Sequence, residues 1–106
     1  MDFTKKVTTE DILKAIGHVE HPEIASTLIE LGMILDVVVV ENKMTRVALA
    51  LPMLGIPEAV RNIIVESIRK PIENLGLKMQ VEFFEMTTEV REHFFALSRA
   101  NWKGQI

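Results

Sequence analysis

Two runs rich in β-branched and other apolar residues lie only three residues apart in this chain of 106 residues. They cover residues 33–40 and 44–51, and Asn42, a residue type that tolerates left-handed backbone, stands between them. This composition and spacing predict a β-hairpin. A turn centred on Asn42 gives four cross-strand pairs, nearly all apolar: Val39 with Thr45, Val37 with Val47, Leu35 with Leu49 and Met33 with Leu51. A shift by one residue would set Asp36 opposite Leu49, so we expect the first register.

The opposite face of the hairpin is also largely apolar. It carries Ile34, Asp36, Val38, Val40, Met44, Arg46, Ala48 and Ala50. Asp36 and Arg46 lie diagonally across from each other on this face. Because a face of this composition is not expected to be fully exposed to water, a homodimer formed through Val38, Val40 and Met44 is one interpretation.

The first third of the chain predicts a helix followed by turns. Thr8 is placed to cap a helix over residues 9–16, with acidic residues in its first turn. A polar loop follows over residues 18–23. Residues 24–31 then have the apolar spacing of a short helical turn, and Gly32 is placed to close it.

The second half of the chain predicts two helices and one strand. A long apolar stripe indicates a helix over residues 57–74, in which Pro71 predicts a bend or an early end. Alternating apolar residues indicate a strand over residues 77–84. Thr87 or Thr88 then caps a last helix.

This order of elements, α-β-β-α-β-α, predicts one domain of the α/β (α+β) class over residues 1–106. We expect a two-layer sandwich on a three-stranded mixed sheet that begins with the hairpin. The crossover from the second strand to the third should be right-handed if those strands are parallel. Residues 1–7 are expected to form a loose arm and residues 101–106 a tail, in which Trp102 is expected to pack back onto the domain.

Composition excludes several classes of function. The net charge of −3 and the pI near 5.6 argue against nucleic-acid binding, which normally needs a basic surface. No apolar run reaches the roughly 20 residues of a membrane span, and no secretory signal precedes the domain, so a cytoplasmic location is expected. The sequence has no cysteine, so it has no disulfide, no thiolate metal ligand and no thiol nucleophile.

No arrangement of residues in the sequence indicates an enzyme. His18 and His21, with the acids between and after them, are candidate metal ligands that His93 could join, although two histidines on a solvated loop are the simpler interpretation. No serine stands in a nucleophile elbow, and no phosphate-binding loop is present. No cofactor is therefore predicted. Met53 and Met86 follow predicted strands and are candidates for a contact surface.

Residues 51–57 join the second predicted strand to the long helix. Gly55 is expected to relax the backbone of this turn, and Pro57 suits the first position of a helix. A helix N-terminus that follows such a turn is a natural place to hold an anion or a thiolate. Neither a cysteine nor a phosphate-binding lysine stands in this loop.

Three short motifs occur in a distinctive order: His21-Pro22-Glu23, then Leu31-Gly32-Met33-Ile34, then Gly55-Ile56-Pro57 at the helix start. They resemble the PaaD/SufT-like family, which is linked to iron–sulfur cluster assembly and also forms the N-terminal domain of Mrp-type ATPases. The family pattern is Asp-Pro-Glu, Leu-Gly-Met/Leu-Val and Gly-Cys-Pro. The likeness spans about residues 10–100, and it implies a fold like the C-terminal NifU-type domains.

Two positions depart from the family pattern. Ile56 stands where the family has its reactive cysteine, and His21 stands where the first motif has Asp. The resemblance therefore implies an accessory or adaptor protein that contacts iron–sulfur assembly proteins or apoprotein clients and does not hold a cluster on cysteine; a transient cluster or metal stays open. The implied contact surface contains His21, Pro22, Glu23, Gly32, Met53, Gly55, Ile56 and Pro57. The alternatives are a metal-binding or catalytic module on His18 and His21, and a structural homodimer.

Overall fold

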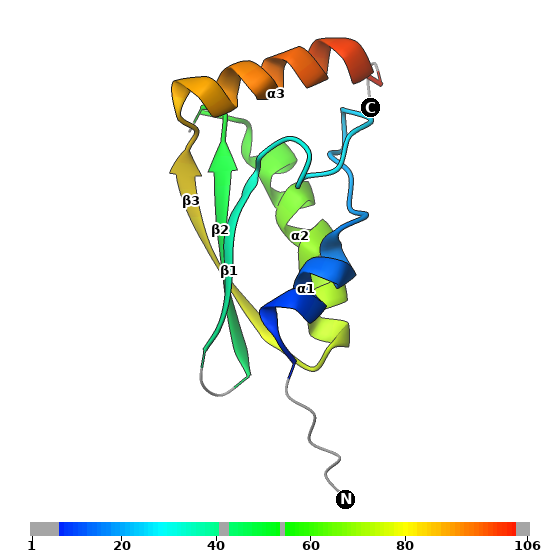
Figure 1. Ribbon diagram of the computed structural model, residues 1–106, viewed down its shortest axis with the longest axis vertical. Helices are drawn as coiled ribbons and strands as arrows, with labels where there is room; N and C mark the ends of the chain where they lie inside the picture. The colour runs from blue at the N-terminus through cyan, green and yellow to red at the C-terminus, as the bar shows by residue number, and fades with distance from the viewer. Residues whose placement is uncertain (1–6, 41–42, 54, 104–106) are drawn as a thin grey trace, which may run out of the picture.

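The computed structural model describes residues 7–40, 43–53 and 55–103. Within them the elements follow in the predicted order (Figure 1): α1 (Thr9–Ile16), β1 (Ile34–Val40), β2 (Met44–Leu51), α2 (Glu58–Asn74), β3 (Lys78–Glu85) and α3 (Thr88–Asn101). The predicted compact α+β fold on a three-stranded mixed sheet is confirmed for this part of the chain. Asn42, most of the expected arm and the last residues of the expected tail lie outside the described residues.

Capping residues in the sequence explain where two of the helices begin. At α1, the Thr8 hydroxyl accepts the N–H of Asp11 at 3.1 Å, and the Asp11 carboxylate accepts the N–H of Thr8 at 3.0 Å. At α3, the Thr87 hydroxyl accepts the N–H of Val90. By contrast, α2 begins after Pro57 without a side-chain cap, and it continues through Pro71. The early end that Pro71 allowed therefore does not occur.

The sheet has the order β1-β2-β3, in which β1 and β2 are antiparallel and β2 and β3 are parallel. The predicted register is correct at Val37–Val47 and Val39–Thr45. It is wrong nearer the start of β1, because a bulge lets Ile34, and not Leu35, lie opposite Leu49. Leu35 is the extra residue, and its side chain is 52% exposed.

Further along the predicted pairing, Met33 lies outside β1. It is held to β2 by one backbone bond, in which its carbonyl accepts the N–H of Ala50 at 2.8 Å. The predicted pair of Met33 with Leu51 is therefore replaced by this contact one residue earlier in β2.

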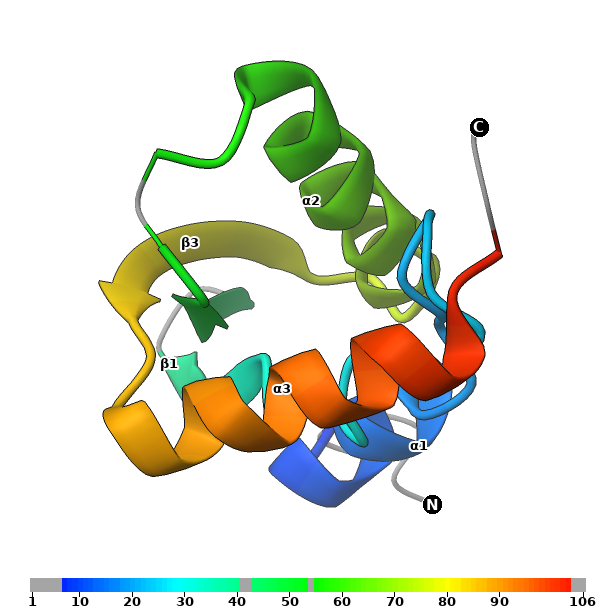
Figure 2. The ribbon, with the colours of Figure 1, turned by 90° about the horizontal axis from the view of Figure 1, so that it is seen from above.

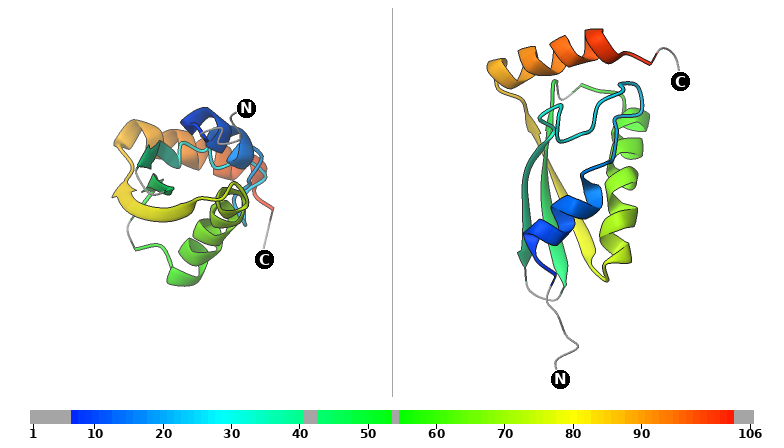
Figure 3. Two further views of the ribbon diagram at one scale, coloured as in Figure 1. Left: turned by 90° about the horizontal axis from the view of Figure 1, so that it is seen from below. Right: turned by 45° about the vertical axis from the view of Figure 1, so that its right-hand side comes forward.

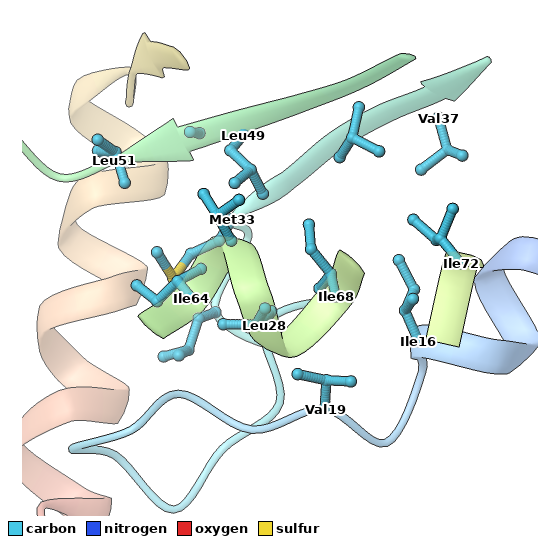
Figure 4. Close-up of a cluster of buried hydrophobic side chains, with 14 of the residues drawn as sticks. Ile16, Val19, Leu28, Met33, Val37, Leu49, Leu51, Ile64, Ile68 and Ile72 are labelled. Atoms are coloured by element: carbon cyan, nitrogen blue, oxygen red, sulfur yellow. The ribbon is translucent and has the colours of Figure 1, made fainter. Parts of the chain in front are cut away.

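Helices α1 and α2 cover the same face of the sheet (Figures 1 and 3). The core lies between the two layers, and Figure 4 shows Ile64 and Ile68 of α2 pointing toward Leu49 on β2. All three side chains are fully buried. Within the described residues, no helix combines the length and the apolar composition needed to cross a membrane.

The loop between α1 and β1 contains the helical turn expected over residues 24–31, reduced to a single turn. Thr27 and Glu30 bond each other's backbone N–H through their side chains, and the N–H of Leu31 reaches the carbonyl of Thr27. The turn ends at Gly32, whose φ of 76° lies in the left-handed region. This loop and the loop after β2 lie at the end of the sheet that α3 crosses (Figure 2).

Candidate functional site

Two of the three motif segments, and Pro52 directly after β2, contact one stretch of α3. Val90 lies against Gly32, Arg91 binds the carbonyl of Pro52, and Phe94 packs on the ring of His21. These three α3 residues lie within little more than one helical turn, or roughly 6 Å along the helix axis. Figure 2 shows the start of α2, which the third motif precedes, on the far side of the fold from α3. We call the end of the sheet at which these segments lie the motif end: residues 21–23, 31–34 and 52–57.

His21 is a buried, hydrogen-bonded residue and not a solvated loop histidine. Its side chain is 4% exposed, and its Nδ1 accepts the backbone N–H of Glu23 at 2.9 Å. Its ring also meets Phe94 edge to face, with 6.1 Å between the ring centroids. Asp and Asn side chains commonly accept the N–H two residues ahead in a turn. His21 makes the same bond through Nδ1, so the loop keeps a turn acceptor although its residue differs from the Asp of the family pattern.

Burial, together with a smaller effect of the positive charge of Lys103, lowers the pKa of His21 from 6.5 to about 4. The Lys103 ammonium group donates to the His21 carbonyl at 3.4 Å. An Nδ1 that accepts a hydrogen bond carries no proton, so the neutral ring has its proton on Nε2. The ring is therefore neutral near pH 7, and its Nδ1 is already used by the loop.

Gly32 allows α3 to approach the loop closely. A Cβ at this position would lie 2.9 Å from Cγ1 of Val90, and the φ of 76° disfavours other residue types. The second motif therefore has a packing function at the motif end, in addition to any role in binding.

Arg91 fastens α3 to the ends of β2 and β3, a role that was not predicted from the sequence. Its Nε donates to the Pro52 carbonyl at 2.7 Å, and its Nη2 donates to the Met86 carbonyl at 3.1 Å. The same nitrogen lies 3.2 Å from the Glu85 carboxylate. In the sequence, Arg91 is one of several charged residues in a helix with a polar face, which carries no signal for this role.

The turn after β2 differs from its expected chemistry at Gly55. A Cβ added there would meet nothing within 4 Å, and its φ is not in the left-handed region, so this turn does not require glycine. Ile56 is half-buried and packs against the core, while Pro57 is exposed at the start of α2. An apolar side chain thus occupies the position at which the family has its cysteine.

Exposed apolar side chains remain on two sides of the motif end. Met53 is 49% exposed in the turn after β2. Trp102, whose backbone pairs with Ile24 next to the first motif, is 52% exposed, so the expected packing of its ring is only partial. Met86, by contrast, is buried in the core, and its predicted place on a contact surface is wrong.

The proposed metal ligands are not brought together. His18 is exposed, and His93 binds the backbone carbonyl of Glu30 through Nε2 at 2.8 Å. Among the residues that the structure describes, no three His, Cys, Asp or Glu residues are grouped so that they could hold a metal ion. The geometry therefore gives no support to a metal site on His18 and His21.

A scan against protein-family models, a search of curated proteins and a search of solved structures each found no match for this chain. The likeness to the PaaD/SufT-like family therefore rests on its three short motifs.

Proposed function

We propose that this protein is an accessory or adaptor protein of iron–sulfur cluster assembly or delivery, and that it acts by contact with other proteins. The observation that supports the proposal is that the motif segments lie at one end of the sheet, where Val90 and Phe94 of α3 contact Gly32 and His21. Arg91 of the same helix binds the carbonyl of Pro52, three residues before the third motif. The first two motifs are therefore close to each other in the fold, and the third follows the strand end that Arg91 anchors.

The proposal assigns the cluster to the partner and not to this chain. A cluster is normally held on cysteine thiolates, and this sequence contains none. Ile56 packs against the core at the position of the family's cysteine, so that side chain supports the turn and offers no ligand. We therefore place the cluster chemistry on the assembly proteins or apoprotein clients, in the cytoplasm.

The surface for such a contact has exposed apolar groups next to polar ones. Met53 and Trp102 each expose about half of their side chains, and both residue types are enriched at protein interfaces. Gly55 and Pro57 are exposed beside Met53, and Glu23 is half-buried beside Trp102. We expect Met53 and Trp102 to contribute most of the binding energy and the neighbouring backbone to make the surface complementary in shape to the partner.

Anaerobic affinity capture from native-source lysate at low salt, read by mass spectrometry, tests the proposal. We expect the wild-type protein to enrich cluster scaffolds, Mrp-type ATPases or iron–sulfur apoproteins. The variants Met53→Asp and Gly55→Arg should lose at least about tenfold of this enrichment, because each changes an exposed position of the proposed surface.

The matched control is Lys70→Glu, which changes an exposed charge on α2 and should capture the same proteins as the wild type. Circular dichroism should give all three variants the melting temperature of the wild type within a few degrees. Enrichment of unrelated proteins only, or equal capture by Gly55→Arg and the wild type, would refute the proposal.

A further inference from the structure

The sheet has an open face, opposite to the face that α1 and α2 cover. No helix of the described chain lies on it (Figures 1 and 3). Its exposed side chains include Val38 at 41% and Phe84 at 44%. The face thus presents apolar side chains to solvent over all three strands.

The observed register arranges the side chains of the open face in rows that run across the strands. From the hairpin end upward, the rows are Val40, Met44 and Lys78; then Val38, Arg46 and Gln80; then Asp36, Ala48 and Glu82. Successive rows on one face are about 6.8 Å apart. Asp36 and Glu82 therefore lie in one row, whereas Lys78 and Arg46 lie in the two rows nearer the hairpin.

Arg46 is not firmly engaged within its own chain. Its Nε lies 4.0 Å from the Glu82 carboxylate, and both side chains are more than half exposed. An exposed pair at this distance contributes little to stability. A shallow hollow beside this pair is lined by Arg46, Gln80, Val81 and Glu82.

A second copy of this chain can pack on the open face in two ways that keep the strands aligned. With the strands of the two copies parallel, each row faces itself, so the acidic row would meet the acidic row and Arg46 would meet Arg46. With the strands antiparallel, the order of the rows is reversed. The row of Arg46 then faces the row of Asp36, Ala48 and Glu82 of the second copy, so opposite charges meet.

We propose that the open face is the interface of a two-fold symmetric homodimer with antiparallel strands. Arg46 of each copy lies over Ala48 of the other, where a small side chain leaves room for it, between Asp36 and Glu82 of that copy. Val40 and Met44 of each copy lie toward the Phe84 end of the other. The residues of this face are thus complementary to themselves in both charge and size, which a two-fold interface requires.

The dimer should be weak. A face of three strands and three rows has a flat footprint on the order of 300 Å² per copy, which is below the roughly 800 Å² per partner of standard stable interfaces. The inference is independent of the proposed function, because its test uses the purified chain alone.

Sedimentation velocity of the purified chain tests the interface. Between about 5 and about 500 µM, we expect the weight-average mass to rise from one chain toward two, and to fall again when NaCl is raised from about 50 to about 500 mM. A chain that stays monomeric at the highest concentration in low salt would refute the dimer.

A charge exchange then tests the register. Arg46→Glu should weaken dimerisation at least about tenfold, because the new carboxylate of each copy then faces the carboxylates of Asp36 and Glu82 of the other copy. The double variant Asp36→Lys with Glu82→Lys should be equally weak, since its lysines face Arg46. An equimolar mixture of the two variants should dimerise again, because every cross-copy pair is then of opposite charge.

Lys70→Glu is the control, since it makes the same change in net charge on the helix that covers the other face. It should dimerise as the wild type does. If Arg46→Glu dimerises as the wild type does, the open face is not the interface. If the mixture stays monomeric while the wild type dimerises, the antiparallel register is wrong.

Discussion

His21 links the stability of this fold to pH. Its pKa is 6.5 as an ordinary histidine and about 4 in the folded chain, so between these values the unfolded state binds more protons than the folded state. The stabilisation is fully present above about pH 6.5 and is lost as the pH falls toward 4. The shift corresponds to roughly 3 kcal/mol of stability between these limits.

Replacing His21 by Asn should remove most of this pH dependence. Asn has an amide oxygen that can accept the Glu23 N–H in place of Nδ1, but it does not titrate. We expect the free energy of unfolding, measured by urea titration from pH 7 to pH 4.5, to fall less in His21→Asn than in the wild type, by up to about 3 kcal/mol. Equal slopes for His21→Asn and the wild type would contradict the assignment.

Thr45 carries a polar atom that the core does not use. Its side chain is fully buried between Val39 and Met79 on the neighbouring strands, and its hydroxyl has no hydrogen-bond partner among the described residues. A buried hydroxyl without a partner costs about 1–3 kcal/mol.

Thr45→Val should therefore stabilise the protein by about 1 kcal/mol, because valine keeps the shape and removes the desolvated oxygen. Urea unfolding at pH 7 measures the change. Thr45→Ser is the comparison: it keeps the hydroxyl and removes the methyl group, and it should destabilise the protein. A Thr45→Val variant less stable than the wild type would show that the hydroxyl is satisfied in solution.

At the scale of elements, α3 depends on polar anchors more than on burial. Phe94 is its only buried residue in the described chain. The helix is held by Arg91 at one end and by Asn101 at the other, where the Asn101 side chain donates to Ser26 at 2.9 Å. Such an element is expected to open locally before the rest of the fold does.

Arg91→Met should loosen α3 without unfolding the sheet. Methionine keeps an apolar stem but cannot donate to the Pro52 and Met86 carbonyls, and hydrogen bonds from a charged group are worth about 1.5–3 kcal/mol. Native-state hydrogen exchange should become faster across α3 and stay unchanged in α2. Arg99→Met, an exposed change in the same helix, should leave both rates as they are. Unchanged exchange in Arg91→Met would mean that apolar packing alone holds α3.

The helices and strands whose apolar residues recur with a clear period were predictable from the sequence, whereas the contacts between loops were not. The stripe of α2 and the alternation of β2 each report on one face of one element, and both were correct. The bulge at Leu35 was missed because Ile34 and Leu35 are both apolar, so the pattern reads equally well with either residue facing the core.

The motif end could be predicted only as a set of segments. The resemblance selected His21 and Gly32, but neither the burial of His21 nor its bond to Glu23 has a local signal in the sequence. Arg91 was missed for a related reason, since its hydrogen-bond partners are the backbone carbonyls of Pro52 and Met86. Carbonyl groups occur at every position and leave no mark in a sequence.

At the scale of the whole molecule, the two layers leave one face and one end of the sheet for different uses. Helices α1 and α2 bury the inner face, and α3 crosses the end, where it contacts His21, Gly32 and Pro52 (Figure 2). The outer face stays free for a second copy of the chain. A single three-stranded sheet can therefore support a contact surface at its end and, independently, a self-association surface on its face.

The bond between Ser26 and Asn101 joins residues 75 positions apart, and the N–H of Ala25 also binds the carbonyl of Asn101 at 2.7 Å. During translation, the loop before β1 leaves the ribosome long before its partner in α3 has been made. The hairpin can form early, because its contacts are local, but the loop before β1 must wait until Asn101 has been made. The motif end therefore cannot be completed before α3 is synthesised, and a nascent chain that stops before α3 lacks the contacts that hold His21 and Gly32 in place.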